Sequence, residues 1–324
     1  MLYNVKAGIL GLDDLGEKYA DLLKEHIKNI SLIAACGRTQ KELLYAKNTL
    51  SLEYVYGDEK QIIENHDVDA LFIFSEAHLR ANLAIQAIEK GKHVFMINPI
   101  ALNVEDAEAV RKTAESHPSQ TVMCGSNIRA SVILSELKDI LKQDKLGDVK
   151  MVEISSNFMN SINKLHAKAS GSKYLDGMLD EIELCNWLFG DNVESVEVRD
   201  KKSLKICDAY FEDGKEIRYL ARFDSDSEYG SLKIETSKAS ICLNSKDRNH
   251  IDIYYTDGSW ERHELNHGHT VQLPEYIQLQ HFTNSILNKE KKGLGLASAV
   301  KGMELALAFE KSDVLGNPVT LDKS

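Results

Sequence analysis

A glycine-containing turn near the start of the chain constrains the fold more than any other feature. It lies within residues 5–16, directly after a short apolar run at residues 7–10. Residues 17–27 follow with the apolar spacing of a helix. A buried strand, a tight glycine turn and a helix N-terminus together present backbone N–H groups to a phosphate anion. The stretch therefore predicts a Rossmann-type nucleotide-binding unit.

The glycine pattern of this turn is incomplete. Gly11 and Gly16 match the first and third glycines of G-x-G-x-x-G, but Asp13 stands at the middle position. The middle glycine lets the phosphates approach the backbone, so a carboxylate there adds bulk and negative charge. We expect Asp13 to oppose dinucleotide binding. The expected cofactor-binding turn comprises Gly11, Leu12, Asp13, Asp14, Leu15 and Gly16.

Composition narrows the class of protein. The chain has 324 residues, 43% of them hydrophobic, which is enough for two domains. A formal charge of −11 disfavours nucleic acid and anionic membrane as the main partners. Without a signal peptide or a long apolar run, we expect a cytoplasmic protein. Five scattered cysteines indicate reduced, buried thiols, and no metal site is expected.

The pattern of apolar residues differs between the two halves of the chain. Short apolar runs alternate with helical segments up to residue 124, which predicts a doubly wound parallel sheet of the α/β class for residues 1–125. Beyond residue 150, period-2 alternation between turn signals predicts a large, mostly antiparallel open sheet. We expect residues 126–324 to form this α+β domain, with the last helix packing back on the N-terminal domain.

Polar residues follow several expected strands. Rossmann folds often place a carboxylate after the second strand to hold the adenosine ribose, whereas this chain has Arg38. An arginine without a carboxylate favours NADP over NAD; the alternative is an arginine in a solvated loop. Ser75 and His78 follow the fourth strand, and Asn98 and Pro99 follow the fifth. Because the carboxyl ends of parallel strands share one edge, these residues are expected to line the same crevice.

The order of the motifs resembles the glucose–fructose oxidoreductase/inositol dehydrogenase (Gfo/Idh/MocA) family over nearly the whole chain. The matching stretches are Gly8 to Gly11 with Gly16, residues 91–95 with Pro99, and residues 125–127, 145–149, 175–190 and 316–321. The resemblance implies NAD(P)-dependent oxidation or reduction of a sugar- or cyclitol-like small molecule. It also implies a homodimer or homotetramer formed through the C-terminal sheet.

Two of the family's usual catalytic residues are replaced in this sequence. Asn98 takes the place of the lysine of the family's E-K-P motif, and an amide cannot release a proton at useful pH. Asp176 matches the aspartate of D-x-x-x-H, while Asp180 replaces its histidine. Asp176 and Asp180, one helical turn apart, are expected to share a face, where mutual repulsion would let Asp180 serve as the base. The alternative is that they cap a helix, pair with Lys173 or Lys168, or face water.

Other residues near this helix could contact a substrate. The resemblance places Asn127 and Lys173 beside Asp176 and Asp180 as substrate-binding residues. A basic loop with Lys164, His166 and Lys168 precedes the helix and could close over the crevice or face solvent. Two functional hypotheses follow: a divergent NAD(P)-dependent oxidoreductase with a degenerate catalytic set, and a non-catalytic relative that senses a ligand or binds a partner.

Overall fold

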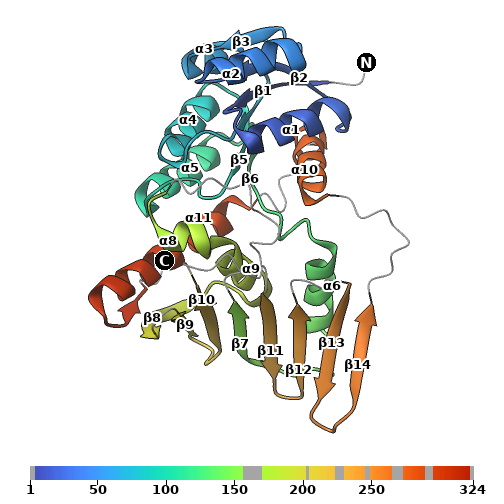
Figure 1. Ribbon diagram of the computed structural model, residues 1–324, viewed down its shortest axis with the longest axis vertical. Helices are drawn as coiled ribbons and strands as arrows, with labels where there is room; N and C mark the ends of the chain where they lie inside the picture. The colour runs from blue at the N-terminus through green and yellow to red at the C-terminus, as the bar shows by residue number, and fades with distance from the viewer. Residues whose placement is uncertain are drawn as a thin grey trace. The chain divides into compact units, whose positions relative to one another are not determined.

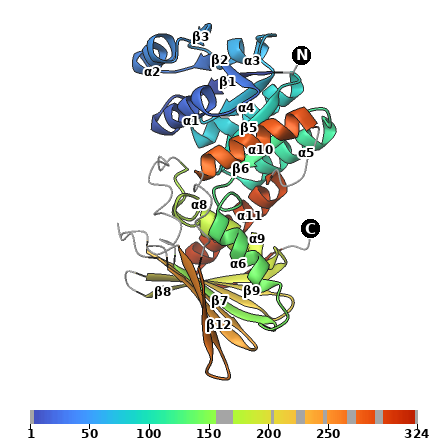
Figure 2. The same cartoon turned by 90° about the vertical axis from the view of Figure 1, so that its right-hand side faces the viewer.

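The computed structural model describes residues 4–155, 170–201, 204–222, 230–244, 249–264, 273–288 and 295–321. Its contacts divide the chain into two units, each built on one sheet (Figures 1 and 2). The first unit is Met1–Ala130 with Gln272–Val300, and the second is Ser131–Val271 with Lys301–Ser324. The first unit therefore takes two separate stretches of chain, whereas the expectation was a domain of residues 1–125 with the last helix packing back on it.

The first sheet is parallel throughout and has the order β3-β2-β1-β4-β5-β6. This confirms the predicted doubly wound sheet. The order reverses between β1 and β4, so the ligand crevice of such a sheet lies at their carboxyl ends. The strands are β1 (Val5–Leu10), β2 (Ile30–Cys36), β3 (Tyr54–Tyr56), β4 (Ala70–Ile73), β5 (His93–Ile97) and β6 (Val122–Gly125).

Helices connect these strands. They are α1 (Asp14–Glu25), α2 (Gln40–Leu44), η1 (Tyr45–Thr49), α3 (Glu59–Glu64), α4 (Ala77–Glu89) and α5 (Val104–Ser116). The first helix begins at Asp14, before the expected residue 17, because the Asp13 side chain caps it. The helix expected over residues 40–50 is α-helical only to Leu44; η1 then widens into a π-turn, in which the Leu50 N–H donates to the Tyr45 carbonyl.

An aromatic cluster explains why a late helix belongs to the first unit. Phe282 on α10 (Pro274–Asn288) lies with its ring centroid 5.3 Å from Phe72 and 5.6 Å from Phe95. Tyr19 on α1 completes the cluster, 5.9 Å from Phe95. These side chains are buried, and burial of such large apolar surfaces dominates core stability.

The second sheet is mostly antiparallel, as expected, with the order β14-β13-β12-β11-β7-β10-β9-β8-β15. Only β7 and β10 pair in parallel within the described strands. The strands are β7 (Val149–Ser155), β8 (Val193–Lys201), β9 (Leu204–Phe211), β10 (Glu216–Ala221), β11 (Ser231–Thr236), β12 (Ala239–Asn244), β13 (His250–Tyr255), β14 (Trp260–Glu264) and β15 (Val319–Thr320). The strands β9 and β15 were not predicted from the sequence.

A row of polar side chains crosses the face of this sheet opposite its buried apolar positions. Direct cross-strand neighbours in the row are Glu197, Asp208, Arg218, Glu153, Lys233, Cys242, Asp252 and Arg262. We call this set the charge row. Its signs largely alternate, and opposite charges on paired strands stabilise a sheet.

Helices pack on the other face of the second sheet, and Figure 2 shows α6 (Val132–Leu141) and α9 (Leu179–Phe189) on one side of it. Tyr219 on β10 packs edge-on against Phe309 of α11 (Leu296–Leu315), with ring centroids 5.5 Å apart. Among the residues that the structure describes, no helix has the length and apolar character to cross a membrane.

Candidate functional site

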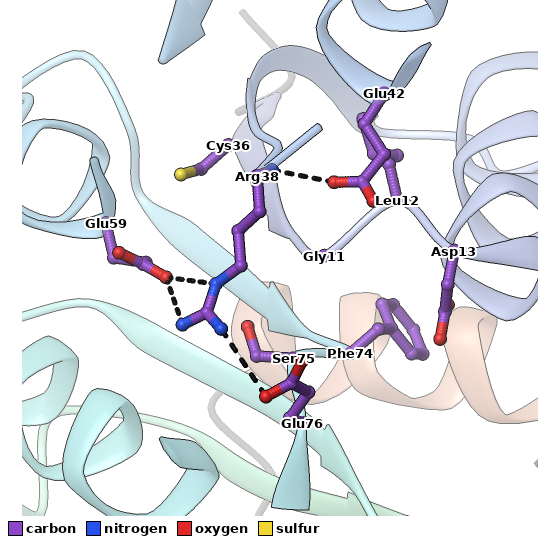
Figure 3. Close-up of a pocket in the computed structure, with 10 residues that line it drawn as sticks. All are labelled: Gly11, Leu12, Asp13, Cys36, Arg38, Glu42, Glu59, Phe74, Ser75 and Glu76. Atoms are coloured by element: carbon purple, nitrogen blue, oxygen red, sulfur yellow. Dashed lines mark hydrogen bonds and ion pairs between the residues drawn. The ribbon is translucent and has the colours of Figure 1, made fainter. Parts of the chain in front are cut away.

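A pocket lies at the switch point between β1 and β4. It has a volume of about 120 Å³, and Figure 3 shows the side chains around it. Four carboxylates and one guanidinium are among its lining groups, which makes the pocket acidic. The lining residues are Gly11, Leu12, Asp13, Cys36, Arg38, Glu42, Glu59, Phe74, Ser75 and Glu76.

The two glycines of the turn are required by close packing. Gly11 has φ +89°, and a Cβ atom there would lie 2.9 Å from the Ser75 nitrogen. A Cβ atom on Gly16 would collide with the carbonyl of Gly11. Only glycine allows this backbone conformation and this approach of helix to strand. The turn therefore has the cradle of a dinucleotide-binding motif.

The Asp13 side chain occupies the N-terminus of α1, where a phosphate would bind. Its carboxylate accepts a hydrogen bond of 3.0 Å from the Gly16 N–H and caps α1. A phosphate at the helix N-terminus would meet both this competing acceptor and its negative charge. Leu12 and Leu15 are buried and pack into the core, whereas Asp14 is exposed.

A carboxylate does stand at the end of β2, although the sequence analysis found none there. Glu42 folds back from α2, and its Oε2 accepts a 2.7 Å hydrogen bond from the Arg38 backbone N–H. The signal was present in Thr39-Gln40-Lys41-Glu42, because Thr39 caps α2 by accepting from the Glu42 N–H. A T-x-x-E sequence is a capping box, in which the glutamate reaches back towards the start of the helix.

The Arg38 guanidinium crosses the pocket between two acids (Figure 3). Its Nη2 lies 2.8 Å from Glu59 Oε1, and its Nη1 lies 3.5 Å from Glu76 Oε2. Hydrogen bonding to Glu59 raises the pKa of Arg38 above its usual value. The arginine that made NADP the expected cofactor is thus already engaged by carboxylates. Burial, with Glu59 nearby, also raises the pKa of Cys36, to about 12, so this thiol is neutral.

The remaining crevice residues of the first unit are placed as follows. Ser75 lines the pocket, while His78 is exposed and lies 3.4 Å from Glu76 Oε2. Asn98, which precedes a cis bond to Pro99, accepts a 3.3 Å hydrogen bond from Cys124 Sγ through its Oδ1 atom.

Two further side chains of this unit form hydrogen bonds between separate segments of the chain. The Oδ1 atom of Asn127 accepts a 2.7 Å hydrogen bond from Gln278 on α10. Arg80 on α4 was not singled out from the sequence, yet it hydrogen-bonds the carbonyls of Ser75, Ile97 and Pro99. A single arginine thus joins the ends of β4 and β5.

The second unit carries the two candidate catalytic acids on separate helices. Asp176 lies in α8 (Lys173–Gly177) and Asp180 in α9, with a break at Met178, where φ is −137°. The expected continuous helix is therefore wrong, and the spacing of four residues does not by itself put the two carboxylates on one face. Asp176 Oδ1 accepts a 3.3 Å hydrogen bond from the Ser170 N–H.

Lys173 makes an ion pair with an acid of α11. Its ammonium lies 2.8 Å from Asp313 Oδ2 on α11. The loop residues Lys164, His166 and Lys168 lie outside the described residues. Within the described ranges, no group of three or more His, Cys, Asp or Glu residues is arranged to hold a metal ion.

The first unit defines the class of this protein: it is a Rossmann-fold protein with a glycine-cradled switch-point pocket. The model of an oxidoreductase family with an NAD-binding Rossmann fold matches residues 5–126. Myo-inositol 2-dehydrogenase of Thermotoga maritima is 26% identical over 193 residues, which cover 59% of this chain and 57% of that protein. These matches support membership of the Gfo/Idh/MocA family of oxidoreductases, and the low identities are those of a divergent relative.

Solved structures share the fold over the full chain. Myo-inositol 2-dehydrogenase of Lactobacillus plantarum has a TM-score of 0.81 at 22% identity and covers 98% of this chain and 100% of its own. Scyllo-inositol dehydrogenase of Lactobacillus casei, with bound NAD(H) and scyllo-inositol, has a TM-score of 0.78 at 22% identity and covers 98% and 99%. At such identities the likeness establishes the fold of both units.

Proposed function

We propose that this protein is an NAD-dependent oxidoreductase that acts on a hydroxyl or carbonyl group of a sugar- or cyclitol-like small molecule. The observation that carries the proposal is the tight turn at Gly11 and Gly16, where a Cβ atom at either position would collide with neighbouring backbone. Backbone N–H groups at such a turn suit the pyrophosphate of a dinucleotide. When bound, the nicotinamide supplies the hydride donor or acceptor.

NAD suits the pocket better than NADP. The 2′-phosphate of NADP would enter among Glu42, Glu59 and Glu76, whose charges exceed that of Arg38. NAD carries a 2′-hydroxyl instead, and a carboxylate at the end of the second strand accepts its hydrogen bond in many Rossmann folds. Glu42 takes that role here. The NADP expected from Arg38 alone is the less favourable cofactor.

Proton transfer falls to the second unit. Asn98 can orient a substrate oxygen by a hydrogen bond but cannot take its proton. Asp176 and Asp180 are then the candidate bases, acting as two separate carboxylates. A positioned general base contributes about 10²–10⁴-fold to rate. Asn127 and Lys173 would add contacts to the substrate's hydroxyl groups.

A second candidate function is a non-catalytic one, in which the protein senses a ligand or binds a partner. Two observations favour it. The Asp13 carboxylate takes the Gly16 N–H that a phosphate would use. Asn98 stands where the family's motif has a lysine, and its Oδ1 atom accepts a hydrogen bond from Cys124.

Turnover assays with NAD⁺ and a panel of inositols and sugars separate the two functions. We expect measurable NADH production that falls at least about 100-fold in Asp176→Asn and Asp180→Asn. The control is Asp191→Asn, which changes an exposed acid just beyond α9. NADH binding without turnover of any polyol would favour the sensor, and turnover unchanged in both variants would contradict the assigned bases.

We also propose that a second copy of this chain binds the charge row, giving the homodimer or homotetramer expected from the family. An alternating row becomes complementary to itself when a copy is turned by 180°. Sedimentation at low and high salt tests this. We expect an oligomer that dissociates when Lys233→Glu and Arg262→Glu are combined, and a wild-type monomer would contradict the proposal.

A further inference from the structure

Arg80 is a buried cation whose donors point at the backbone. The residue is 6% exposed, and its Nε and Nη2 atoms donate to the Ser75 carbonyl at 3.2 and 2.7 Å. Its Nη1 donates to the carbonyls of Ile97 at 3.2 Å and Pro99 at 2.5 Å. The guanidinium fork thus fixes the carboxyl ends of the two strands that border the crevice.

No carboxylate pairs with this charge in the part of the chain that the structure describes. Every hydrogen bond of the guanidinium goes to a carbonyl, and the group forms no ion pair. Burial lowers the pKa of Arg80 to about 10, while Cys124 and Asp13 oppose that shift. Arg80 is therefore a cation at neutral pH. A buried charge without a counter-ion is costly, and carbonyl dipoles compensate it only in part.

The position of this cation relates it to the pocket. Ser75, whose carbonyl it holds, lines the pocket, and so does Asp13, which interacts with it electrostatically. With Asp13 included, the pocket is lined by four carboxylates, and its one lining cation, Arg38, is already paired. An anionic ligand entering such a pocket needs a fixed positive charge, and fields act strongly through low-dielectric protein.

We propose that Arg80 is a positioning residue for the diphosphate of a bound nucleotide: it fixes the ends of β4 and β5 and supplies the positive charge that offsets the acids of the pocket. The inference rests on the proposed function, because it explains how the acidic nucleotide pocket can bind an anionic cofactor. Arg80 acts through Ser75 and through its field, since it is too buried to contact the ligand. A diphosphate adds negative charge to a pocket that is already acidic, so the buried cation lowers the electrostatic cost of its binding.

The proposal predicts that loss of the Arg80 charge weakens the binding of charged ligands but not of neutral ones. Adenosine occupies the same nucleoside site as ADP but lacks the diphosphate. Calorimetry with both ligands on Arg80→Met should show ADP affinity lowered about tenfold and adenosine affinity unchanged within about twofold. Arg80→Lys keeps the charge and should retain most of the ADP affinity. The control is Arg111→Met, which removes a half-buried α5 arginine paired with Glu108 and Glu115.

The outcomes are distinct. Equal weakening of ADP and adenosine in Arg80→Met would show a purely structural role and overturn the proposal. If circular dichroism shows that Arg80→Met does not fold, Arg80→Lys decides: an ADP-to-adenosine affinity ratio within about threefold of wild type supports the charge, and a tenfold drop overturns it. Wild-type protein that binds ADP but neither NADH nor NADPH would refute the proposed function and leave this test intact. Wild-type protein that does not bind ADP would refute both.

Discussion

The Asp13 carboxylate accepts a hydrogen bond from the Gly16 N–H at 3.0 Å. One side chain thereby caps the first helix and places a negative charge at the N-terminus where a dinucleotide phosphate would bind. Asp13 therefore caps the helix and, at the same time, opposes the binding of an anion at its N-terminus. Removing the obstruction should improve ligand binding at little expense in stability.

Asp13→Gly should bind NADH about tenfold more tightly than wild type, because bulk and like charge leave the cradle together. Glycine is a tolerated cap, so the free energy of unfolding should fall by only a few tenths of a kcal/mol. Calorimetry and urea unfolding measure the two effects. Asp13→Asn, which keeps the capping oxygen, isolates the charge, and Glu25→Gln, at the exposed far end of α1, serves as the control. An unchanged affinity in Asp13→Gly would mean that Asp13 does not obstruct the site.

The preference for NAD should depend on the acids that hold Arg38. Combining Glu59→Gln with Glu76→Gln removes both of its charged partners and frees the guanidinium for a 2′-phosphate. We expect the ratio of NADPH to NADH affinity to rise at least about tenfold, measured by fluorescence titration. Glu64→Gln, an exposed acid 3.9 Å from Lys90, should leave the ratio unchanged. A double variant that keeps the wild-type ratio would rule out this account of cofactor choice.

Asp208 should be the most sensitive acid of the second sheet. It is fully buried and bonded by Arg199 and Arg218. Replacing one member of a buried ion-pair network leaves the partner charges uncompensated, so Asp208→Asn should cost about 3–5 kcal/mol in the free energy of unfolding. Asp139→Asn breaks the exposed pair with Lys142 and should cost less than about 1 kcal/mol. Similar losses in the two variants, by urea unfolding, would contradict the role of burial.

Asp313 predicts a defined acid dependence of stability. Burial opposes its ionisation, but hydrogen bonds from Lys173 and Lys205 prevail and lower the pKa of Asp313 to about 2. A carboxylate with a depressed folded-state pKa stabilises the protein above its unfolded value near 3.8, and the contribution disappears as pH falls towards 2. The stability gap between wild type and Asp313→Asn should therefore be constant above about pH 5 and should narrow between pH 4 and 2. A gap independent of pH would show that the ion pair contributes nothing.

Local pattern was enough to predict the parallel sheet. The apolar runs that became β1, β4 and β5 are short and continuous, which is typical of strands buried on both faces. The helix over residues 104–116 was also predicted with its observed bounds. In these segments the periodicity, the caps and the packing all agree.

The features that were missed depend on contacts distant in sequence. The strand β9 carries Asp208 at a buried position, which breaks period-2 alternation, and only the arginines of β8 and β10 make that burial tolerable. The assignment of α10 to the first unit follows from Phe282, which meets Phe72 and Phe95. No local pattern identifies such partners.

The candidate site was predicted in part. The turn at Gly11 and Gly16 and the positions of Ser75 and Arg38 follow from the strand ends of a Rossmann fold. Glu42 was overlooked although its capping box is visible in the sequence. Arg80 was not detectable, because nothing in a helical stretch shows that an arginine turns inward to strand-end carbonyls.

A crystal structure of the protein grown with NADH tests the central claim most directly. The account predicts that the diphosphate lies on the backbone N–H groups of the turn after β1, with the Asp13 carboxylate displaced from the Gly16 N–H and the adenosine ribose against Glu42. An intact bond between Asp13 and Gly16 in crystals saturated with NADH, with no nucleotide at the ends of β1 and β4, would contradict it.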